Sequence, residues 1–588
     1  MVLIGVGAAV VWRYRVDIVT WEVARVLESQ GLGPATFAID AIEWGSVRAR
    51  DVALLGGAIK AGELIVFFRP MELLSGHLGS VEIGHFIGAF AVGKDGVELN
   101  GKPLASGVGG KSPIAALRVD AFTLRDARLS LATASGPVEA ALSTTLAVAD
   151  GEVRALSFTA KVTAPVAGGR RTANITAQEI LLQPEAADGA WLTVKQAAVT
   201  PEGLPWAAQA IDGKLVWRPD QRTAEVAIGR LVNRQQPMLV SPLGLVATAR
   251  LTGTRLVFSL QATGGKGMLK LQAKGQHDIA SNRGSANIAL APILFRRGSL
   301  QPGDLFPALA GSADDIDGSV ALAGPVRWTG STLSPDLTLK LKDLAFALSS
   351  AQLRQLNGEI KLTRLWPPAT APGQTVTAMV EATGLPPARL SLTGQLAGRP
   401  ALTLERTVFD FAGGEITASP FAIDPAAPRI QTTLRVDHVD LAEITKLLGI
   451  SGLTGTGRLD GPIPLVVESG KVAIAGGRLT AREPGVLSYR PGSLPPEIAK
   501  AGGSVELALQ ALSDFQYDRL TLELDKSSGG EGTVLLRLEG RNPALMSGQP
   551  FNFNIRIDSN FDRLADYALL SLRSAQELLR RAAGRAGP

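Results

Sequence analysis

Two glycine-rich stretches are the segments of this chain best suited by composition to bind phosphate. The first is GVGGKS at residues 107–112, where glycine amides beside a lysine could cradle an anion. The first glycine of the pattern GxxxxGK[ST] would fall on Ala105, however, and no strand-then-helix context surrounds the segment. We therefore interpret 107–112 as a flexible loop between strands.

The second stretch is LTGTGRLDGPIPL at residues 453–465, in which three glycines surround Arg458 and Asp460. Its last glycine interval is wrong for a dinucleotide fingerprint, and Pro-Ile-Pro and a strand follow it where a helix is needed. Gly455 and Gly457 predict tight or left-handed turns. Pro462 predicts an edge, a bulge or a strand start, because proline cannot donate a ladder hydrogen bond. We expect Arg458 and Asp460 to face solvent and the stretch to carry no chemistry.

Side chains able to catalyse or to bind metal are scarce. The four histidines, His77, His85, His277 and His438, form no HExxH or HxH pattern. The chain has no cysteine, which excludes disulfides, cysteine-ligated zinc, iron–sulfur clusters and thiol nucleophiles. It also has no GxSxG motif and no carboxylate pair fixed by a motif. We expect a protein that is not an enzyme, with no cofactor and no metal.

The composition bounds the class of protein. Hydrophobic residues make up 46% of the 588 residues and charged residues 19%, which is too apolar for disorder and too polar for a multi-span membrane protein. The length predicts three or four ordinary domains unless the chain is a repeat or solenoid. The net charge of +5 is spread without a basic block, so we expect no nucleic-acid partner.

The N-terminus begins with an apolar run, Val2 to Trp12, followed by Arg13 and Arg15. A helix that spans a membrane needs about 20 apolar residues, so this run is too short to cross alone. We predict that residues 1–15 are a partial membrane anchor, with a short buried segment as the alternative. Residues 16–31 predict an amphipathic helix that stops at Gly31.

From Ala35 onward the dominant hydrophobic period is two. Leucines alternate with polar residues in LTLKLKDLAFAL and LTLELDK, and phenylalanine and isoleucine do so in FNFNIRID. Turn signals separate such runs about every eight to twelve residues, and no linkers divide the chain. This pattern predicts half-buried, mostly antiparallel strands.

We therefore predict a mostly β fold in which one long twisted antiparallel sheet of about 35 strands curls into an open groove, with short helices. Residues 32–300 would form its N-terminal portion and residues 301–560 its C-terminal portion. The expected apolar lining is Leu337, Leu339, Leu341, Leu520, Leu522, Leu524, Val534, Leu536, Leu538, Phe551, Phe553, Ile555 and Ile557. Periodicity alone leaves open whether these side chains line a groove or fill a core.

Residues 561–588 predict a C-terminal amphipathic helix and tail. Its apolar positions follow three/four spacing: Phe561, Leu564, Ala568, Leu572, Ala575 and Leu579. Such a helix either plugs the end of the sheet or binds a membrane surface or a partner protein.

Many small motifs in the C-terminal half resemble the YdbH-type branch of the AsmA-like superfamily, whose relatives include AsmA and TamB. A short DLA helix precedes the pattern G-x-x-x-G-x-[IL]-P-[IL], and a G-G-x-L and P-G-x-L-x-Y hairpin follows. The matching positions are Asp440 to Ala442, Gly457, Gly461, Pro464, Leu465, Gly476, Gly477, Leu479, Pro484, Gly485, Leu487 and Tyr489, with Gly540, Asn542 and Pro543 downstream. The similarity covers roughly residues 300–588 and is weaker before them.

This resemblance implies a bridge-like repeating β-groove protein of a Gram-negative envelope, anchored in the inner membrane and mostly periplasmic. It implies phospholipids as cargo moving to the outer membrane, and a small outer-membrane lipoprotein docking at the C-terminal sheet edge near Phe551 to Ile557. The family has also carried a dicarboxylate-transport label, which an apolar groove does not suit. The alternative function is a TamB-like periplasmic scaffold that assists outer-membrane or surface proteins.

Overall fold

The computed structural model describes residues 15–560 apart from short gaps. These gaps are 30–32, 74–76, 94–95, 100–101, 104–117, 134–135, 150–151, 167–168, 186–188, 219, 312–314, 348–350, 366, 383–385, 398–401, 425–428, 449, 469–470, 492–502 and 529–530. The predicted anchor and the predicted C-terminal helix lie outside the described residues. The chain divides into two compact units: unit 1 comprises residues 1–286 with 328–332, and unit 2 comprises residues 287–327 with 333–588.

Unit 1 consists almost wholly of strands after one N-terminal helix. Its elements are α2 (Arg15–Ser29), β1 (Thr36–Ile42), β2 (Ser46–Leu54), η1 (Leu55–Gly57), β3 (Ile59–Phe67), α3 (Pro70–Leu73), β4 (His77–Gly84), β5 (Ile87–Gly93), β6 (Gly96–Leu99), β7 (Lys102–Pro103), β8 (Arg118–Thr133), β9 (Gly136–Ala149), β10 (Glu152–Val166), β11 (Gly169–Glu185), β12 (Gly189–Pro201), β13 (Trp206–Trp217), β14 (Gln221–Asn233), β15 (Leu243–Thr252), β16 (Arg255–Gly264), η3 (Gly265–Gly267) and β17 (Leu269–Asp278). Strands β18 (Arg283–Phe295), β19 (Asp317–Thr329) and β20 (Thr332–Pro335) contain residues of both units.

Unit 2 repeats this strand-rich pattern with a few short helices. Its elements are α4 (Pro302–Leu305), η4 (Pro307–Leu309), β21 (Leu337–Ala347), β22 (Ala351–Arg364), β23 (Ala369–Thr370), β24 (Gln374–Ala382), β25 (Ala388–Leu396), β26 (Leu402–Phe411), β27 (Gly414–Ala418), β28 (Phe421–Ile423), β29 (Arg429–Asp440), α5 (Leu441–Leu448), β30 (Leu453–Gly455), β31 (Arg458–Glu468), β32 (Lys471–Ala481), β33 (Gly485–Tyr489), α7 (Gly503–Leu512), β34 (Phe515–Lys526), β35 (Glu531–Arg541), η5 (Met546–Gly548) and β36 (Pro550–Asn560). The short helix expected at the DLA motif, Asp440 to Ala442, is the start of α5, whereas α7 was not expected.

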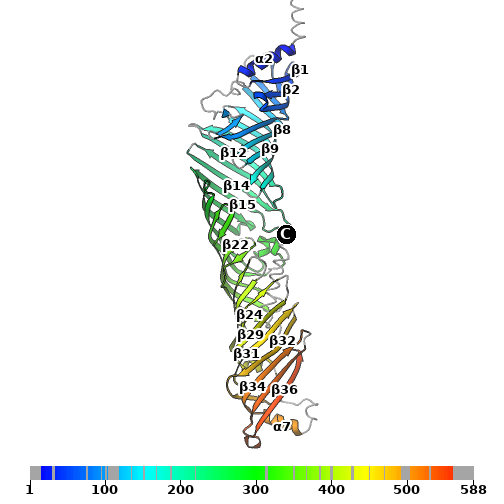
Figure 1. The fold of residues 1–588 in the computed structure, drawn as a ribbon, viewed down its shortest axis with the longest axis vertical. Helices are drawn as coiled ribbons and strands as arrows, with labels where there is room; N and C mark the ends of the chain where they lie inside the picture. Colours follow the sequence, from blue (N-terminus) through cyan, green and yellow to red (C-terminus); the bar gives the residue numbers. More distant parts are fainter. Residues whose placement is uncertain are drawn as a thin grey trace, which may run out of the picture. The chain divides into compact units, whose positions relative to one another are not determined.

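The prediction of a mostly β fold built on one very long sheet is confirmed, since the strands of the described residues belong to a single sheet. Strands β12 to β15 of unit 1 lie side by side in sequence order, whereas in unit 2 the order of neighbours is β29, β31, β32 and β34 (Figure 1). The pairing is mostly antiparallel, as predicted, and the exception is β8, which runs parallel to β4 and β5. The chain reaches β8 only after the small strands β6 and β7, so it returns to the sheet in the same direction as β5.

β-Bulges with positive φ angles interrupt the strands at corresponding places. In unit 1 they fall at Asp126 of β8, Ser157 of β10, Gln196 of β12 and Ala210 of β13. In unit 2 they fall at Asp343, Gln355, His438 and Gly476. A bulge bends its strand and increases the local twist. Bulges repeated across neighbouring strands therefore bend the sheet along a line.

A side chain on the following strand caps the backbone amide at most of these bulges. The amide of Asp126 donates to Ser143 Oγ at 3.2 Å, and the amide of Gln196 donates to Asp212 Oδ1 at 2.9 Å. The same arrangement joins Asp343 to Asn357, His438 to Asp460 and Gly476 to Asp525 at 2.6–2.9 Å. The caps satisfy amides that the bulge removes from the ladder.

The glycine-rich stretch at residues 453–465 contains a further bulge. Pro462 and Pro464 lie in β31, which pairs with β29 along their length but leaves its ladder with β32 between Asp460 and Leu465. Of the three positions predicted for the prolines, the bulge is the observed one. The expectation that Asp460 faces solvent is incomplete. Its carboxylate accepts a hydrogen bond from the His438 amide and lies 3.1 Å from Arg482 Nε.

We expect Asp460→Ala to lower the free energy of unfolding of unit 2 by about 1 kcal/mol, because the His438 amide loses its acceptor. Hydrogen exchange should become faster at the amides of β29 and β31 in the same variant. Asp460→Asn retains the acceptor oxygen and is the matched control, expected to stay close to the native protein. Equal losses in both variants would show that the ion pair with Arg482, and not the amide cap, stabilises the bulge.

Candidate functional site

One face of the unit 1 sheet carries continuous rows of aliphatic side chains across neighbouring strands. We call it the apolar face. In each row, residues hydrogen-bonded across successive strands point the same way. Three such rows cross β12 to β17: Val194, Gly213, Val226, Ala247, Leu260 and Ala273; Leu192, Leu215, Ala224, Ala249, Phe258 and Gly275; and Ala197, Ile211, Ile228, Leu245, Ala262 and Leu271.

The larger side chains of the apolar face remain partly accessible. The deeply buried residues of β10 to β16 are mainly alanines, such as Ala155, Ala177, Ala197 and Ala262. The leucines, valines and isoleucines of the rows are half-buried, and Leu182 of β11 is 43% exposed. A face that was covered by protein would bury its large side chains first. The apolar face of unit 1 is therefore not filled by the described residues.

The opposite face of the same strands is polar. The row one position away along each strand runs through Thr193, Lys214, Glu225, Thr248, Ser259 and Lys274. Cross-strand ion pairs are found on exposed side chains elsewhere in the unit, for example Lys195 with Glu179 at 2.7 Å. That carboxylate's pKa is lowered, chiefly by its hydrogen bond from Lys195. The two faces thus differ sharply in chemistry over the same strands.

A ring cluster covers the apolar face at β16 and β17. Trp328 Nε1 donates to His277 Nδ1 at 3.0 Å, and the two rings stack at 6.0 Å between centroids. Phe258 lies 6.3 Å from Trp328, and the Trp328 ring lies so close to Gly284 that a Cβ there would overlap it. The position of His277 on this face, opposite Leu256, is therefore explained by its bond to Trp328.

In unit 2, the residues predicted to line the groove share one face of their strands. Leu339 and Leu341 are half-buried on β21 and pair with Ile360 and Gly358 of β22, whereas Leu337 is almost fully buried. On β34 to β36 the register sets Leu520 opposite Leu538, Leu522 opposite Leu536 and Leu524 opposite Val534, and then places Phe551, Phe553, Ile555 and Ile557 alongside. Their role as a lipid lining remains a prediction.

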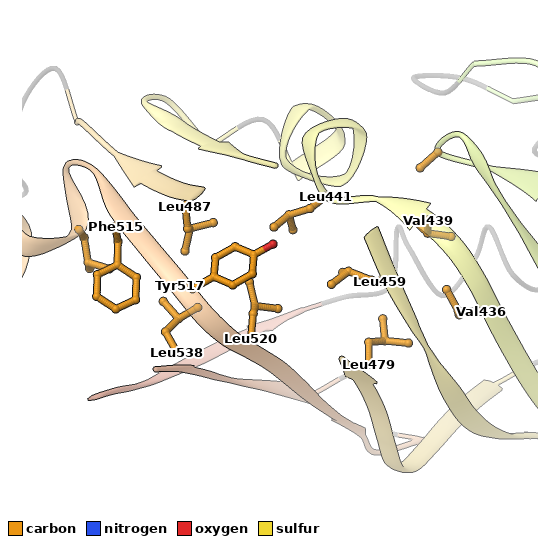
Figure 2. Packing of buried hydrophobic residues seen from close by; sticks show 12 residues of the cluster. Val436, Val439, Leu441, Leu459, Leu479, Leu487, Phe515, Tyr517, Leu520 and Leu538 are labelled. Carbon is orange, nitrogen blue, oxygen red and sulfur yellow. The ribbon is translucent and has the colours of Figure 1, made fainter. Parts of the chain in front are cut away.

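The C-terminal part of that face is packed by protein. Leu520 and Leu538 belong to a cluster of fully buried residues with Phe515 and Tyr517. Leu522, Leu524, Leu536, Phe551, Phe553 and Ile555 pack half-buried against this cluster. Figure 2 shows Leu441 of α5 and Leu487 of β33 close to Tyr517, and β33 pairs with β34. Periodicity could not distinguish this filled core from an open face, because both need the same alternation.

The apolar run of β34 ends at Lys526, which lies on the same side of the strand as Leu522 and Leu524 and is almost fully buried. Its ammonium group donates to the carbonyl oxygens of Val472 at 3.4 Å and Ser527 at 3.5 Å. A buried charge requires such partners. Lys526 was not expected at such a position, and only its place in the alternation of β34 could have revealed it.

The glycines of the stretch at residues 453–465 leave space for Tyr517. The Tyr517 hydroxyl donates to the Thr456 carbonyl at 2.5 Å, and a Cβ at Gly457 would overlap that hydroxyl. Gly457 and Gly461 have φ angles of +120° and +152°, which disfavour other residues. The Gly457 carbonyl also accepts a hydrogen bond from the amide of Leu441 at the start of α5. The stretch is a packing motif, and nothing in its geometry holds a phosphate.

The described residues offer no cluster suited to a metal ion. They contain no group of three or more histidine, aspartate or glutamate side chains that could hold a metal ion. His77 and His85, the two histidines closest in sequence, lie at opposite ends of β4. No helix within the described part of the chain is long and apolar enough to cross a membrane. The feature that remains for function is the apolar face itself.

A long sheet with one accessible apolar face defines a class of proteins that shield apolar molecules from water. Residues 225–565 match the family model described as YdbH-like, intermembrane phospholipid transport protein YdbH. This match covers more than half of the chain, so the chain belongs to the YdbH-like family. The match begins well before residue 300, where the sequence motifs had become weak. Among curated proteins, no individual sequence matches the chain.

Burial raises the pKa of Tyr517 above its ordinary value of 10. Below pH 10 the phenol is neutral in the folded and the unfolded chain, so the contribution of Tyr517 to the free energy of unfolding is fully present there. Above pH 10 the unfolded chain ionises first, and this contribution is lost as the pH rises through the folded pKa.

We therefore expect the free energy of unfolding of the native protein to fall more steeply above pH 10 than that of Tyr517→Phe. Urea unfolding at neutral pH and above pH 10 measures this difference. Tyr489→Phe is the control, because it removes another tyrosine of the same core region. Parallel declines in the native protein and in Tyr517→Phe would contradict the assignment.

Proposed function

We propose that this protein moves phospholipids between the inner and outer membranes of a Gram-negative envelope, with their acyl chains in contact with the apolar face. The observation that carries the proposal is the set of unfilled aliphatic rows of unit 1. Each acyl CH₂ kept out of water there is worth about 0.8 kcal/mol. The YdbH-like family description names the same cargo.

The chemistry of the rows suits a sliding cargo. Aliphatic side chains of alternating size form a surface without hydrogen-bond donors or acceptors, so no position fixes a headgroup. The polar face and its ion pairs stay in water on the other side of the sheet. Transport of this kind needs no bond-making step, and we infer a protein that is not an enzyme.

The lipid contacts that we propose are limited to accessible side chains. On unit 1 these are the half-buried leucines, valines and isoleucines of the three rows, and on unit 2 they include Leu339 and Leu341. Leu337, Leu520 and Leu538 are each at most 2% exposed, so they support the sheet and do not touch cargo.

We also propose that the chain is anchored in the inner membrane through the apolar run of residues 2–12, which would leave most of the chain in the periplasm. At the other end, β36 is hydrogen-bonded to β35, and no second neighbour is found among the described residues. A free edge is suited to strand addition. We propose that a small outer-membrane lipoprotein pairs with β36.

A photo-crosslinker at Asn554 should capture a protein, and capture of lipid alone there would contradict this pairing.

A photo-crosslinker at Leu245 and another at Val246 test the transport proposal in cells. The two residues are adjacent and apolar, but Leu245 lies on the apolar face and Val246 lies on the polar face, 54% exposed. We expect Leu245 to capture phospholipid and Val246 to capture none, because only one face meets the acyl chains.

Capture of polypeptide at Leu245 in place of lipid would favour the second candidate function, a TamB-like scaffold for outer-membrane or surface proteins. Equal capture of lipid at both positions would contradict transport along one face.

A further inference from the structure

Two neighbouring chain reversals in unit 1 expose large apolar side chains at their tips. The turn between β1 and β2 carries Trp44, which is 85% exposed, and α3 after β3 carries Met71, which is 82% exposed. Phe67, the last residue of β3, is 38% exposed. We call these three residues the Trp44 patch.

Backbone hydrogen bonds hold the two reversals side by side. The Phe68 amide donates to the Gly45 carbonyl at 3.0 Å, and the ladder between β2 and β3 sets Ser46 opposite Phe67. Within the turns, the Glu43 amide donates to Ser46 and the Glu72 amide to Arg69 at 2.8–2.9 Å. The exposed side chains are therefore presented from one end of the same strand pair.

The charged groups around the patch are largely paired with one another. Arg69 lies 3.0 Å from Glu72, and Ser46 Oγ donates to Glu43 Oε2 at 3.3 Å. One cation and two carboxylates give these surroundings a net charge of only −1. The patch therefore has no strong charge with which to attract an anionic polymer, and its binding energy must come from apolar contact.

We propose that the Trp44 patch inserts into the interfacial layer of a phospholipid bilayer. Tryptophan prefers that layer, because its ring is apolar while its indole N–H stays hydrated. The patch lies on the first strands after α2, which contacts β1, and the chain before α2 contains the apolar run of residues 2–12. The same end of the chain thus supplies two apolar features suited to one membrane.

The size of the patch favours a bilayer over a protein partner. A stable protein interface uses about 20–30 residues on each side. Three side chains on two tips are too few for that, whereas shallow insertion into lipid needs only a few large side chains. The patch therefore adds a membrane contact to the proposed function without depending on the cargo.

The absence of cysteine from the sequence permits a site-specific test on the full chain. Met71→Cys, labelled with an environment-sensitive fluorophore, is reconstituted into phosphatidylethanolamine–phosphatidylglycerol vesicles that contain nitroxide-labelled lipid. Val246→Cys, labelled alike, is the control, because Val246 is also an exposed apolar residue of unit 1 but lies on the polar face, away from the proposed cargo. We expect severalfold stronger quenching at position 71 than at position 246, and no loss of it at high salt.

Adding Trp44→Ser to the labelled Met71→Cys protein should reduce that quenching severalfold, with the circular dichroism spectrum unchanged because Trp44 is exposed. The proposal is overturned if position 71 is quenched no more than position 246, if Trp44→Ser has no effect, or if a second copy of the chain shields the label without quenching by lipid. None of these results affects lipid capture at Leu245, so the patch and the transport proposal fail separately.

Discussion

The strands in the described part of the chain turn successive side chains to opposite faces, and over β12 to β17 one of those faces carries continuous apolar rows. A sheet that grows by adding such strands accumulates an apolar surface that must be shielded. The bulges meet this constraint, because they bend several strands at corresponding places, and at most of them a side chain accepts the amide that leaves the ladder. The carboxylate of Asp460 and that of Asp212 therefore do for the backbone what a ladder bond does elsewhere.

The apolar sides of the sheet in the two units differ in how far protein side chains fill them. In the C-terminal part of unit 2 that side is filled by large side chains around Tyr517, with α5 and β33 contributing Leu441 and Leu487. In unit 1 the buried positions are mostly alanines, and the larger aliphatic residues stay accessible. A rigid, filled end and an unfilled face are compatible with one role, in which the filled end supports the docking edge at β36 and the open face meets the cargo.

The sequence was sufficient for the fold class because an alternation of two residues is a local signal. It was insufficient for α7, where Val505, Leu507, Leu509 and Ala511 alternate as in a strand while the leucine, alanine and glutamate content favours a helix. The parallel pairing of β8 was also unpredictable, because it depends on the path of the chain through β6 and β7. The same holds for the candidate site. Alternation predicts that Leu520 and Leu538 lie on the apolar side of their strands, but their burial depends on residues far away in sequence, such as Leu441 and Leu459.

The central claim is that lipid contacts an extended face and not a single pocket. Native mass spectrometry of the full chain, purified without stripping its lipids, counts the phospholipids bound to each molecule. The account predicts several phospholipids per chain, and fewer when Leu260 on the apolar face is changed to Glu than when Ser259 on the polar face is changed in the same way. A chain that carries no phospholipid, or one whose lipid count is unchanged by Leu260→Glu, would contradict it.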